Sequence, residues 1–204
     1  MTLHINEAEV RQLLTMPMAI AAVEEVSRKQ AEGTVVVHPR RRFELAGGGF
    51  FHYMAAMDSG ANLVAMKQYT YVKGKLCFLV PLYSTETGEL LALIEADYMG
   101  QLRTGAASGV ATKYLAHKLA KSAAIIGTGG QARTQLEAIH NVRMLDSVYV
   151  YGRNPERRNA FVTKPPRVWE STFIPWTRAP QRSKTRRSSA LPPRLRSPFC
   201  AAQM

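Results

Sequence analysis

The chain has 204 residues and a formal net charge of +12 at pH 7, a size that suits one domain with a large core or two small ones. Its two cysteines form no disulfide framework, and no signal peptide or apolar segment of membrane length is evident, so we expect a cytoplasmic protein without membrane segments. The charge is concentrated in the tail, because residues 163–204 hold nine basic residues and one acid, whereas residues 1–162 carry a net +4.

Two helices are expected at the start of the chain. Asn6 is a candidate N-cap with Glu9 at the third helical position, the arrangement of a capping box. A second helix is expected from Thr15, with Pro17 in its first turn, to Gly33.

A series of antiparallel strands follows. The expected strands are Val35–His38, Phe50–Met54, Leu63–Tyr71, Leu76–Tyr83 and Leu90–Glu95. Gly47–Gly49, the Lys73–Lys75 turn and the Thr85–Gly88 turn separate neighbouring strands and are typical of hairpins. This pattern predicts an α+β domain with an antiparallel meander.

The pattern changes to strand, glycine turn, helix and strand over residues 121–151. An apolar run at 121–126 precedes a G-x-G-x-x-A motif, and the strand Ser147–Tyr151 follows the helix. Such a context is typical of dinucleotide binding. Gly127 permits the tight turn, Gly129 lets the backbone approach a pyrophosphate, and Ala132 is small enough for close helix–strand packing. The phosphates would bind the helix N-terminus. A tight turn that binds nothing is the alternative.

The end of the second strand bears on the choice of cofactor. An acidic residue at this position holds the ribose hydroxyls in NAD enzymes. Here the strand ends Tyr151-Gly152-Arg153-Asn154, without an acid. Arg153 could accept a 2′-phosphate, which favours NADP, or it could be a solvated charge at the sheet edge.

Residues 163–204 differ in composition from the rest of the chain. They contain seven of the eleven prolines and both tryptophans, with no helical or alternating period. We expect a basic, disordered tail, and we interpret it as translation out of frame, which would leave the nucleotide domain at 119–162 incomplete. A nucleic-acid-binding arm and a linker remnant are the competing interpretations, of which we disfavour the first.

Several spaced motifs give the chain a specific resemblance. They are Pro39-x-Arg41, Tyr53-Met54-Ala55-Ala56-Met57, Lys67 in AMKQY, PLYSTETGELLALIEAD, Arg103-Thr104-Gly105-Ala106-Ala107 and the GTGGQA turn. In this order and spacing, residues 3–162 resemble the ornithine cyclodeaminase/mu-crystallin family. The resemblance implies an α/β protein with a substrate-binding and dimerisation domain at 1–118, followed by a Rossmann-type domain, and a homodimer.

The resemblance also implies roles for individual residues. Arg41, Lys67 and Arg103 match the positions that hold the substrate carboxylate, for which guanidinium groups offer bidentate pairing. Lys67, in an otherwise apolar strand, would also act in proton transfer to the substrate nitrogen; a rim lysine in water is the alternative. The dinucleotide, NAD or NADP, would be bound at these positions: Thr104, Gly127, Thr128, Gly129, Gly130, Gln131, Ala132 and Arg153. Arg40 and Arg42, which flank Arg41, are expected to be solvated.

The family's chemistry is hydride exchange between a nicotinamide and the Cα of a small amino or imino acid. The first assignment is an ornithine cyclodeaminase-type lyase that forms proline and ammonia, and the second is a ketimine or pyrroline-2-carboxylate reductase or an alanine dehydrogenase. His52 lies where the cyclodeaminase branch carries an acid, which favours the second. A non-catalytic ligand-binding remnant is the third assignment. We expect little turnover from the chain as written. The histidines show no metal-ligand spacing, so no metal is expected.

Overall fold

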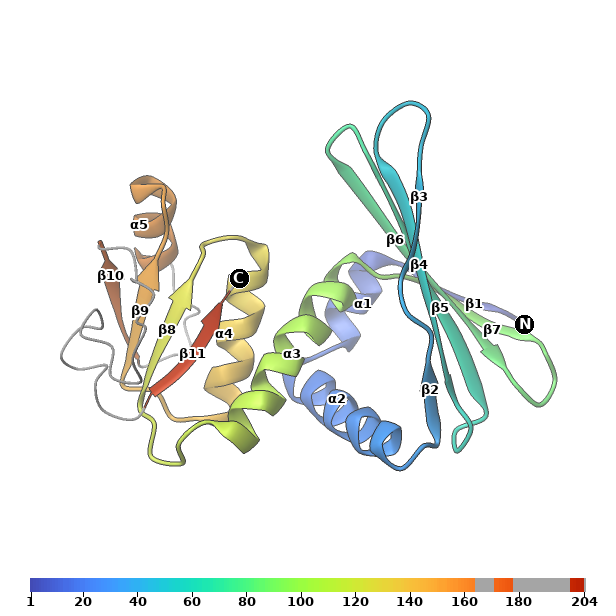
Figure 1. Cartoon of the computed structure of the whole chain (residues 1–204), viewed down its shortest axis with the longest axis horizontal. Coiled ribbons are helices and arrows are strands. Elements are labelled where there is room, and N and C mark those ends of the chain that lie inside the picture. Colours follow the sequence, from blue (N-terminus) through green and yellow to red (C-terminus); the bar gives the residue numbers. More distant parts are fainter. Residues whose placement is uncertain (164–170, 178–198, 204) are drawn as a thin grey trace. The chain divides into compact units, whose positions relative to one another are not determined.

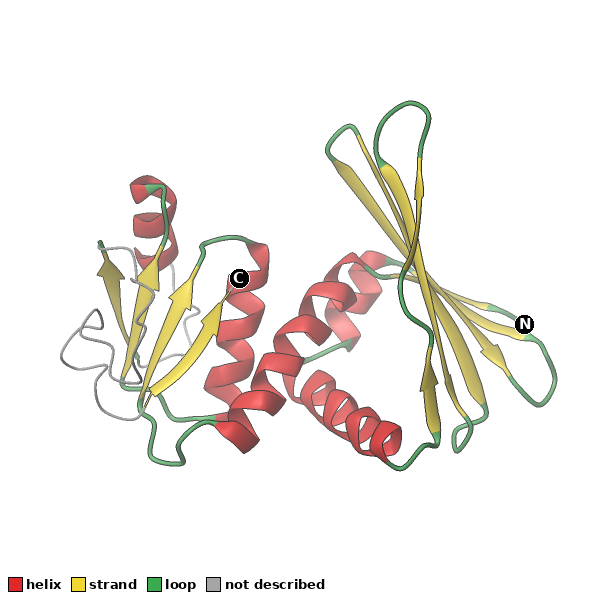
Figure 2. Ribbon diagram, viewed as in Figure 1, coloured by secondary structure: helices red, strands yellow, loops and turns green. Residues whose placement is uncertain are grey.

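A computed structural model describes residues 1–163, 171–177 and 199–203, with backbone placement alone for the last range. The chain divides into two compact units, Met1–Leu102 and Arg103–Met204, and each contains a sheet with helices (Figure 2). This combination of sheets and helices is of the mixed α/β class, as the sequence predicts. In the described ranges, no helix is long and apolar enough to cross a membrane.

The first unit is a seven-stranded sheet with two short helices (Figure 1). The strand order is β1-β7-β6-β5-β4-β2, with β3 also paired to β4, and all pairs are antiparallel except β1 with β7. The elements are β1 (Leu3–Ile5), α1 (Glu7–Leu13), α2 (Met16–Ala31), β2 (Val35–Val37), β3 (Arg41–Glu44), β4 (Phe50–Asp58), β5 (Leu63–Val72), β6 (Lys75–Ser84) and β7 (Leu90–Glu95).

Local sequence signals account for the ends of these elements. Asn6 Oδ1 accepts hydrogen bonds from the backbone N–H groups of Ala8 and Glu9, while Glu9 accepts one from the Asn6 N–H, which confirms the predicted capping box. Lys73 and Gly74 both have positive φ, of 47° and 81°. This conformation is that of a two-residue hairpin turn, and it joins β5 to β6.

The second unit contains a four-stranded parallel sheet in the order β10-β9-β8-β11. This order corresponds to strands 3-2-1-4 of a dinucleotide-binding fold, in which the first strand lies between the second and the fourth. The elements are α3 (Asp97–Leu115), whose first six residues belong to the first unit, β8 (Ser122–Ile126), α4 (Gly130–Val142), β9 (Ser147–Tyr151), α5 (Pro155–Thr163), β10 (Thr172–Trp176) and β11 (Phe199–Gln203).

An apolar core fills the space between this sheet and its helices. Ile125 of β8, Val148 and Val150 of β9, and Leu136 and Ile139 of α4 are all completely buried. The two central strands are therefore covered, as expected for parallel strands that read as apolar runs.

The division between the units differs from the predicted boundary at 118/119. The middle of α3 packs on α4, where Gly105 lies so close to the backbone of Thr134 that an added Cβ would approach within 3.0 Å of it. In addition, the Arg143 guanidinium donates hydrogen bonds to the carbonyl oxygens of Thr112, Lys113 and Ala116 at the end of α3. Most of α3 therefore belongs with the nucleotide-type unit.

The prediction of a disordered tail from 163 onwards is wrong for residues 172–176 and 199–203, which form strands. Trp176 is only 7% exposed and clusters with Ala124 and Tyr149. Pro175 is compatible with β10 because this strand lies at the sheet edge. Residues 164–170, 178–198 and 204 of the predicted tail lie outside the described ranges.

Candidate active site

The glycine turn leaves a backbone surface open at the N-terminus of α4. Gly127 follows β8 with φ of 124°, and its N–H donates to the carbonyl of Tyr151 on β9. Gly129 is the N-cap of α4 without a side-chain cap, and no atom lies within 4 Å of the position that a Cβ would occupy there. Backbone N–H groups at such an end attract anions. Thr128, Gly130 and Gln131 belong to the same turn and first helical residues, as predicted.

Ala132 has the predicted packing role. It is completely buried in the core between α4 and the sheet, where a larger side chain would separate the helix from the strand. The residues present therefore fit a dinucleotide pyrophosphate: a left-handed glycine, an uncapped helix start and a small packing residue lie in succession.

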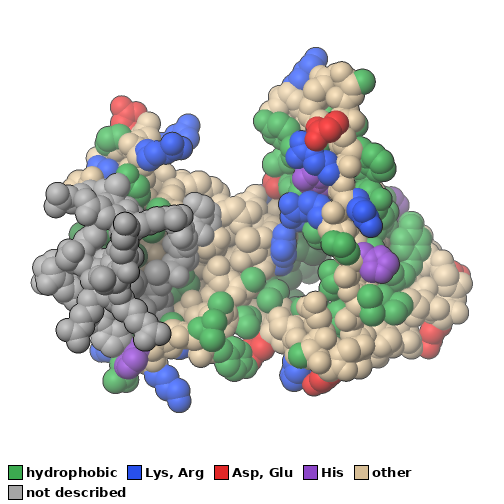
Figure 3. All heavy atoms as spheres, viewed as in Figure 1, with side chains coloured by type: hydrophobic (Ala, Val, Ile, Leu, Met, Phe, Trp, Pro, Cys, Tyr) green, Lys and Arg blue, Asp and Glu red, His purple; other side chains and the backbone are tan. Residues whose placement is uncertain are grey.

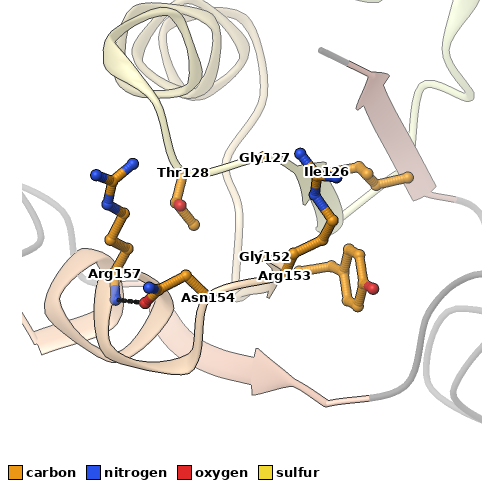
Figure 4. A pocket seen from close by; sticks show the side chains of 8 residues that line it. Ile126, Gly127, Thr128, Gly152, Arg153, Asn154 and Arg157 are labelled. Atoms are coloured by element: carbon orange, nitrogen blue, oxygen red, sulfur yellow. Dashed lines mark hydrogen bonds between the residues drawn. The ribbon is translucent and has the colours of Figure 1, made fainter.

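A pocket of about 380 Å³ adjoins this turn at the carboxyl end of β9. We call it the strand-end pocket (Figure 4). An added Cβ at Gly152 would lie 2.9 Å from Thr128 Cγ2, so a larger residue at this position would require the Thr128 side chain to move. Arg153, predicted from the sequence, lines the pocket, and Arg157 was missed. The complete lining is Ile126, Gly127, Thr128, Tyr151, Gly152, Arg153, Asn154 and Arg157.

Arg103 and Thr104 lie within α3. The helix begins at Asp97, so Arg103 is in its second turn. The helix dipole acts mainly within the first and last turns, so it has little effect on the charge of Arg103. Gly100 is three residues earlier, and residues three apart share one side of a helix.

Lys67 extends over an aromatic surface on one face of the antiparallel sheet. Its Nζ lies 5.3 Å from the ring centroid of Tyr69 and 5.0 Å from that of Phe78. The N-terminal part of α3 covers the same face, since a Cβ on Gly100 would lie 3.8 Å from Lys67 Nζ. The half-buried lysine thus lies between aromatic rings and a helix, and the faces of the rings attract its ammonium group.

The sheet register separates Arg41 from Lys67. Arg41 pairs with Tyr53, whereas Lys67 pairs with Met54, the next residue of β4. Since successive side chains of a strand point to opposite faces, Arg41 and Lys67 lie on opposite faces. Arg42, which pairs with His52, shares the face of Lys67.

The sequence predicted a solvated Arg42. The side chain is exposed, but it also contacts other residues of the protein. Its guanidinium pairs with the Glu44 carboxylate and lies 4.4 Å from the ring centroid of Phe50. Figure 3 shows basic and hydrophobic side chains close together on the visible face of this unit. An arginine that stacks on an aromatic ring and carries an acid partner is held in place.

His52 forms a second polar feature on the face of Lys67. It is 7% exposed, its Nδ1 lies 2.6 Å from the hydroxyl of Tyr69, and its ring stacks on Phe50. Burial lowers the pKa of His52, and the charges of Arg40 and Arg42 lower it further. His52 is therefore neutral at pH 7.

The sequence drew attention to His52 but not to its partner. Tyr69 is two residues from Lys67 on β5 and pairs with His52, so strand alternation could have identified it once the register of β4 was known. Among the described residues, no group of three or more histidine, cysteine or acidic side chains could hold a metal ion.

Comparison with known proteins agrees with this geometry. The chain is 41% identical over 115 residues to a Δ1-pyrroline-2-carboxylate reductase of Bacillus cereus, a match that covers 53% of this chain and 35% of the relative. It is 35% identical over 166 residues to an alanine dehydrogenase of Archaeoglobus fulgidus, covering 79% of this chain and 52% of the relative.

Solved structures give the same result. The Thermococcus litoralis Δ1-pyrroline-2-carboxylate reductase, in complex with NADH and L-proline, superposes with a TM-score of 0.79 at 32% identity, over 86% of this chain and 57% of that one. The chain thus spans about half the length, or less, of these relatives. The model of the ornithine cyclodeaminase/mu-crystallin family matches residues 2–171, and the chain belongs to that family.

Proposed function

We propose that the protein is an NAD(P)-dependent oxidoreductase that reduces a small or cyclic imino acid to the corresponding amino acid, and oxidises it in reverse. The observation that carries the proposal is the open, uncapped glycine turn at the start of α4, within a parallel sheet. The similarity to pyrroline-2-carboxylate reductases and to an alanine dehydrogenase supports the choice of substrate class.

The glycine turn, with Thr104, would hold the dinucleotide. When bound, the nicotinamide supplies or accepts the hydride at the substrate Cα. The N–H groups at the start of α4 would bind the pyrophosphate, for which their partial positive charge is suited. Gly129 is important here because its open surroundings let the phosphates reach the backbone.

Lys67 and Arg103 would bind the substrate carboxylate, as the family resemblance implies. Lys67 would also deliver a proton to the nitrogen as hydride reaches Cα, so that C=N becomes HC–NH; the reverse reaction returns the proton to Lys67. Arg41 is the third residue implied by the resemblance. Arg42 lies on the same face of the sheet as Lys67, and Arg41 does not. We therefore propose that an arginine other than Arg41 binds the substrate carboxylate together with Lys67 and Arg103.

A cyclodeaminase-type lyase is the second candidate, and His52 argues against it. Ornithine carries a second ammonium group, which an acidic residue would bind. His52 is neutral, and the positive charges of Arg40 and Arg42 lower its pKa. The Glu44 carboxylate on the same face already pairs with Arg42. A neutral or anionic substrate side chain suits such surroundings better than a cation does.

The proposal is tested with the purified full chain. The proposal predicts oxidation of NADH or NADPH on addition of Δ1-pyrroline-2-carboxylate, and formation of the reduced cofactor with L-proline or L-alanine, followed by the absorbance of the reduced nicotinamide. The same assay tests the expectation, made from the composition of residues 163–204, that this chain has little turnover, because rapid turnover would contradict it. Release of ammonia from ornithine would support the lyase instead. Dinucleotide binding without any turnover would identify the non-catalytic alternative.

Lys67→Met provides the matched test of mechanism. Loss of a group that both binds the carboxylate and transfers a proton should lower kcat/KM by about 100-fold or more. The control is Lys75→Met, the same substitution at an exposed position on β6. Equal activity of the two variants would contradict the role of Lys67.

We also propose a homodimer that forms through the sheet face opposite Lys67. Phe43 is 58% exposed on that face and stacks on Phe51 and Tyr53, and Met57 and Val36 are also exposed there. An archaeal alanine dehydrogenase of 33% identity and TM-score 0.78 was solved as a dimer with bound NAD, a match covering 85% of this chain and 56% of that one. Light scattering of the wild type and of Phe43→Asp would test this.

A further inference from the structure

We infer that His52 and Tyr69 form a positioning pair for Lys67, in which their hydrogen bond fixes the aromatic ring against which the lysine ammonium lies. The inference rests on the proposed function, in which Lys67 transfers the proton to the substrate nitrogen. Neither His52 nor Tyr69 is assigned a part in the chemistry itself. Their role is to hold the lysine in place.

The strand register brings these residues onto one face of the sheet. His52 of β4 pairs directly with Tyr69 of β5, and Tyr69 pairs in turn with Phe78 of β6. The three strands are neighbours in the sheet (Figure 1). Lys67 precedes Tyr69 by two residues on β5, so its side chain emerges on the same face. Tyr69 is therefore the central residue of this group.

The Tyr69 ring is held at its hydroxyl, at its side and on its face. The hydroxyl lies 2.6 Å from His52 Nδ1, and the two rings meet edge to face with their centroids 5.0 Å apart. The Phe78 ring stacks on Tyr69 with a centroid distance of 4.6 Å. A neutral imidazole can accept the hydroxyl proton or donate its own N–H, and either arrangement forms the bond. Because hydrogen bonds are directional, the ring cannot tilt without losing it.

Packing restricts His52 as well. The residue is 7% exposed, and its ring stacks on Phe50 with a centroid distance of 4.4 Å. The Arg42 guanidinium lies over the same Phe50 ring. A buried imidazole between two aromatic side chains has little room to rotate. A continuous series of contacts therefore leads from Arg42 through Phe50 and His52 to Tyr69.

Lys67 depends on the ring that this pair fixes. Its Nζ lies 5.3 Å from the ring centroid of Tyr69 and 5.0 Å from that of Phe78, and a Cβ on Gly100 of α3 would lie 3.8 Å from it. The faces of aromatic rings attract an ammonium group, whereas a lysine side chain without such contacts samples many rotamers. A proton donor acts when it is within hydrogen-bond reach of the accepting atom. Loss of the fixed ring should therefore slow proton transfer even though the lysine remains.

NMR of the full chain with ¹³C-labelled lysine tests the position of Lys67 without any need for turnover. Ring currents of Tyr69 and Phe78 should shift the ε-CH₂ proton signal of Lys67 upfield from those of exposed lysines, and its absence from Lys67→Met assigns it. In Tyr69→Phe, which keeps the ring and loses one oxygen, this signal should move toward the exposed lysines. His52→Leu should have the same effect.

Two further variants serve as controls for this measurement. His52→Asn, whose amide can replace Nδ1 as the partner of the Tyr69 hydroxyl, should retain the wild-type Lys67 signal. Tyr71→Phe is the same substitution at a 38% exposed position of β5, and it should also leave the signal unchanged. Tyr69→Phe is a minimal change, so the test does not depend on the folding of His52→Leu.

Steady-state kinetics provide the second measurement. Tyr69→Phe and His52→Leu should each lower kcat for the imino acid by about three- to tenfold, as expected for the loss of one hydrogen bond. The KM for the dinucleotide should stay the same, because the dinucleotide is bound at the glycine turn. The double variant should lose no more than either single variant, since both substitutions remove the same bond.

The outcomes separate this inference from a structural role and from the proposed function. An unchanged Lys67 signal in Tyr69→Phe, losses that multiply in the double variant, or lower stability with unchanged kcat would overturn the inference alone. A shifted Lys67 signal in a chain without imino-acid turnover would refute the proposed function and leave the positioning pair in place.

Discussion

Replacing Gly105 by alanine tests the close approach of α3 and α4 that supports the glycine turn. Gly105 is buried in the middle of α3, and an added Cβ would lie 3.0 Å or less from three backbone atoms of Thr134 and Gln135 on α4. Backbone atoms of a helix cannot relieve a close contact by rotation, as a flexible side chain can. The two helices would therefore have to move apart.

The size of the effect follows from two opposing contributions. Overpacking a tight contact costs about 1–3 kcal/mol, whereas alanine in place of glycine within a helix contributes about 0.8–1.0 kcal/mol of stability. Because all three nearest atoms belong to the backbone, we expect the upper part of the first range, and a net destabilisation of about 1–2 kcal/mol.

Gly100→Ala is the matched control in the same helix. The nearest atom to its added Cβ is Lys67 Nζ at 3.8 Å, an ordinary contact with a flexible side chain. This variant should therefore be more stable than the wild type by about 0.5–1 kcal/mol. The two substitutions are chemically identical and should have opposite signs.

The assay is urea and thermal unfolding followed by circular dichroism. A change of 1 kcal/mol should shift the midpoint by about 4–8 °C if the second unit, of about 100 residues, unfolds by itself. If Gly105→Ala proved as stable as Gly100→Ala, the close helix contact, and with it the assignment of α3 to the second unit, would be refuted.

Three further outcomes are expected. Trp176→Ala should destabilise the second unit by about 3 kcal/mol, because the side chain is buried against Tyr149; an effect no larger than that of the exposed Thr172→Ala would show that β10 is not part of the fold. Burial raises the pKa of Glu137 above 4.5 in the folded protein, so ionisation of this carboxyl lowers the stability as the pH rises from 4.5 through the raised pKa. Glu137→Gln should therefore have a higher unfolding midpoint than the wild type at pH 7, and the same midpoint below pH 4.5. The pKa of His52 is lowered below 6.5, so stability should fall as pH drops through 6.5 toward the lowered pKa, and an unchanged acid profile in His52→Gln would contradict this.

Local signals were sufficient for much of the fold. The capping box at Asn6, the hairpin at Lys73–Gly74 and the strands β7 and β9 were predicted where the structure has them, because each depends on residues that are neighbours in sequence. The glycine turn was predicted for the same reason. Its conformation depends on its glycines, whose positions can be read directly from the sequence.

Register and long-range packing decided the rest. Whether Arg41, Arg40 or Arg42 shares a face with Lys67 depends on how β3, β4 and β5 are aligned, and a shift of one residue reverses every side chain. The pairing of His52 with Tyr69 depends on the same alignment.

The end of the chain shows the limit of composition most clearly. The many prolines and arginines around β10 made its short apolar segment hard to recognise in the sequence. The segment forms a strand because it pairs with β9 and because Trp176 is buried against Ala124 and Tyr149. The sequence by itself therefore determined the family, the class of fold and the position of the glycine turn. Only the tertiary structure decided which charges meet on one surface, because burial and strand pairing bring together residues that no local pattern connects.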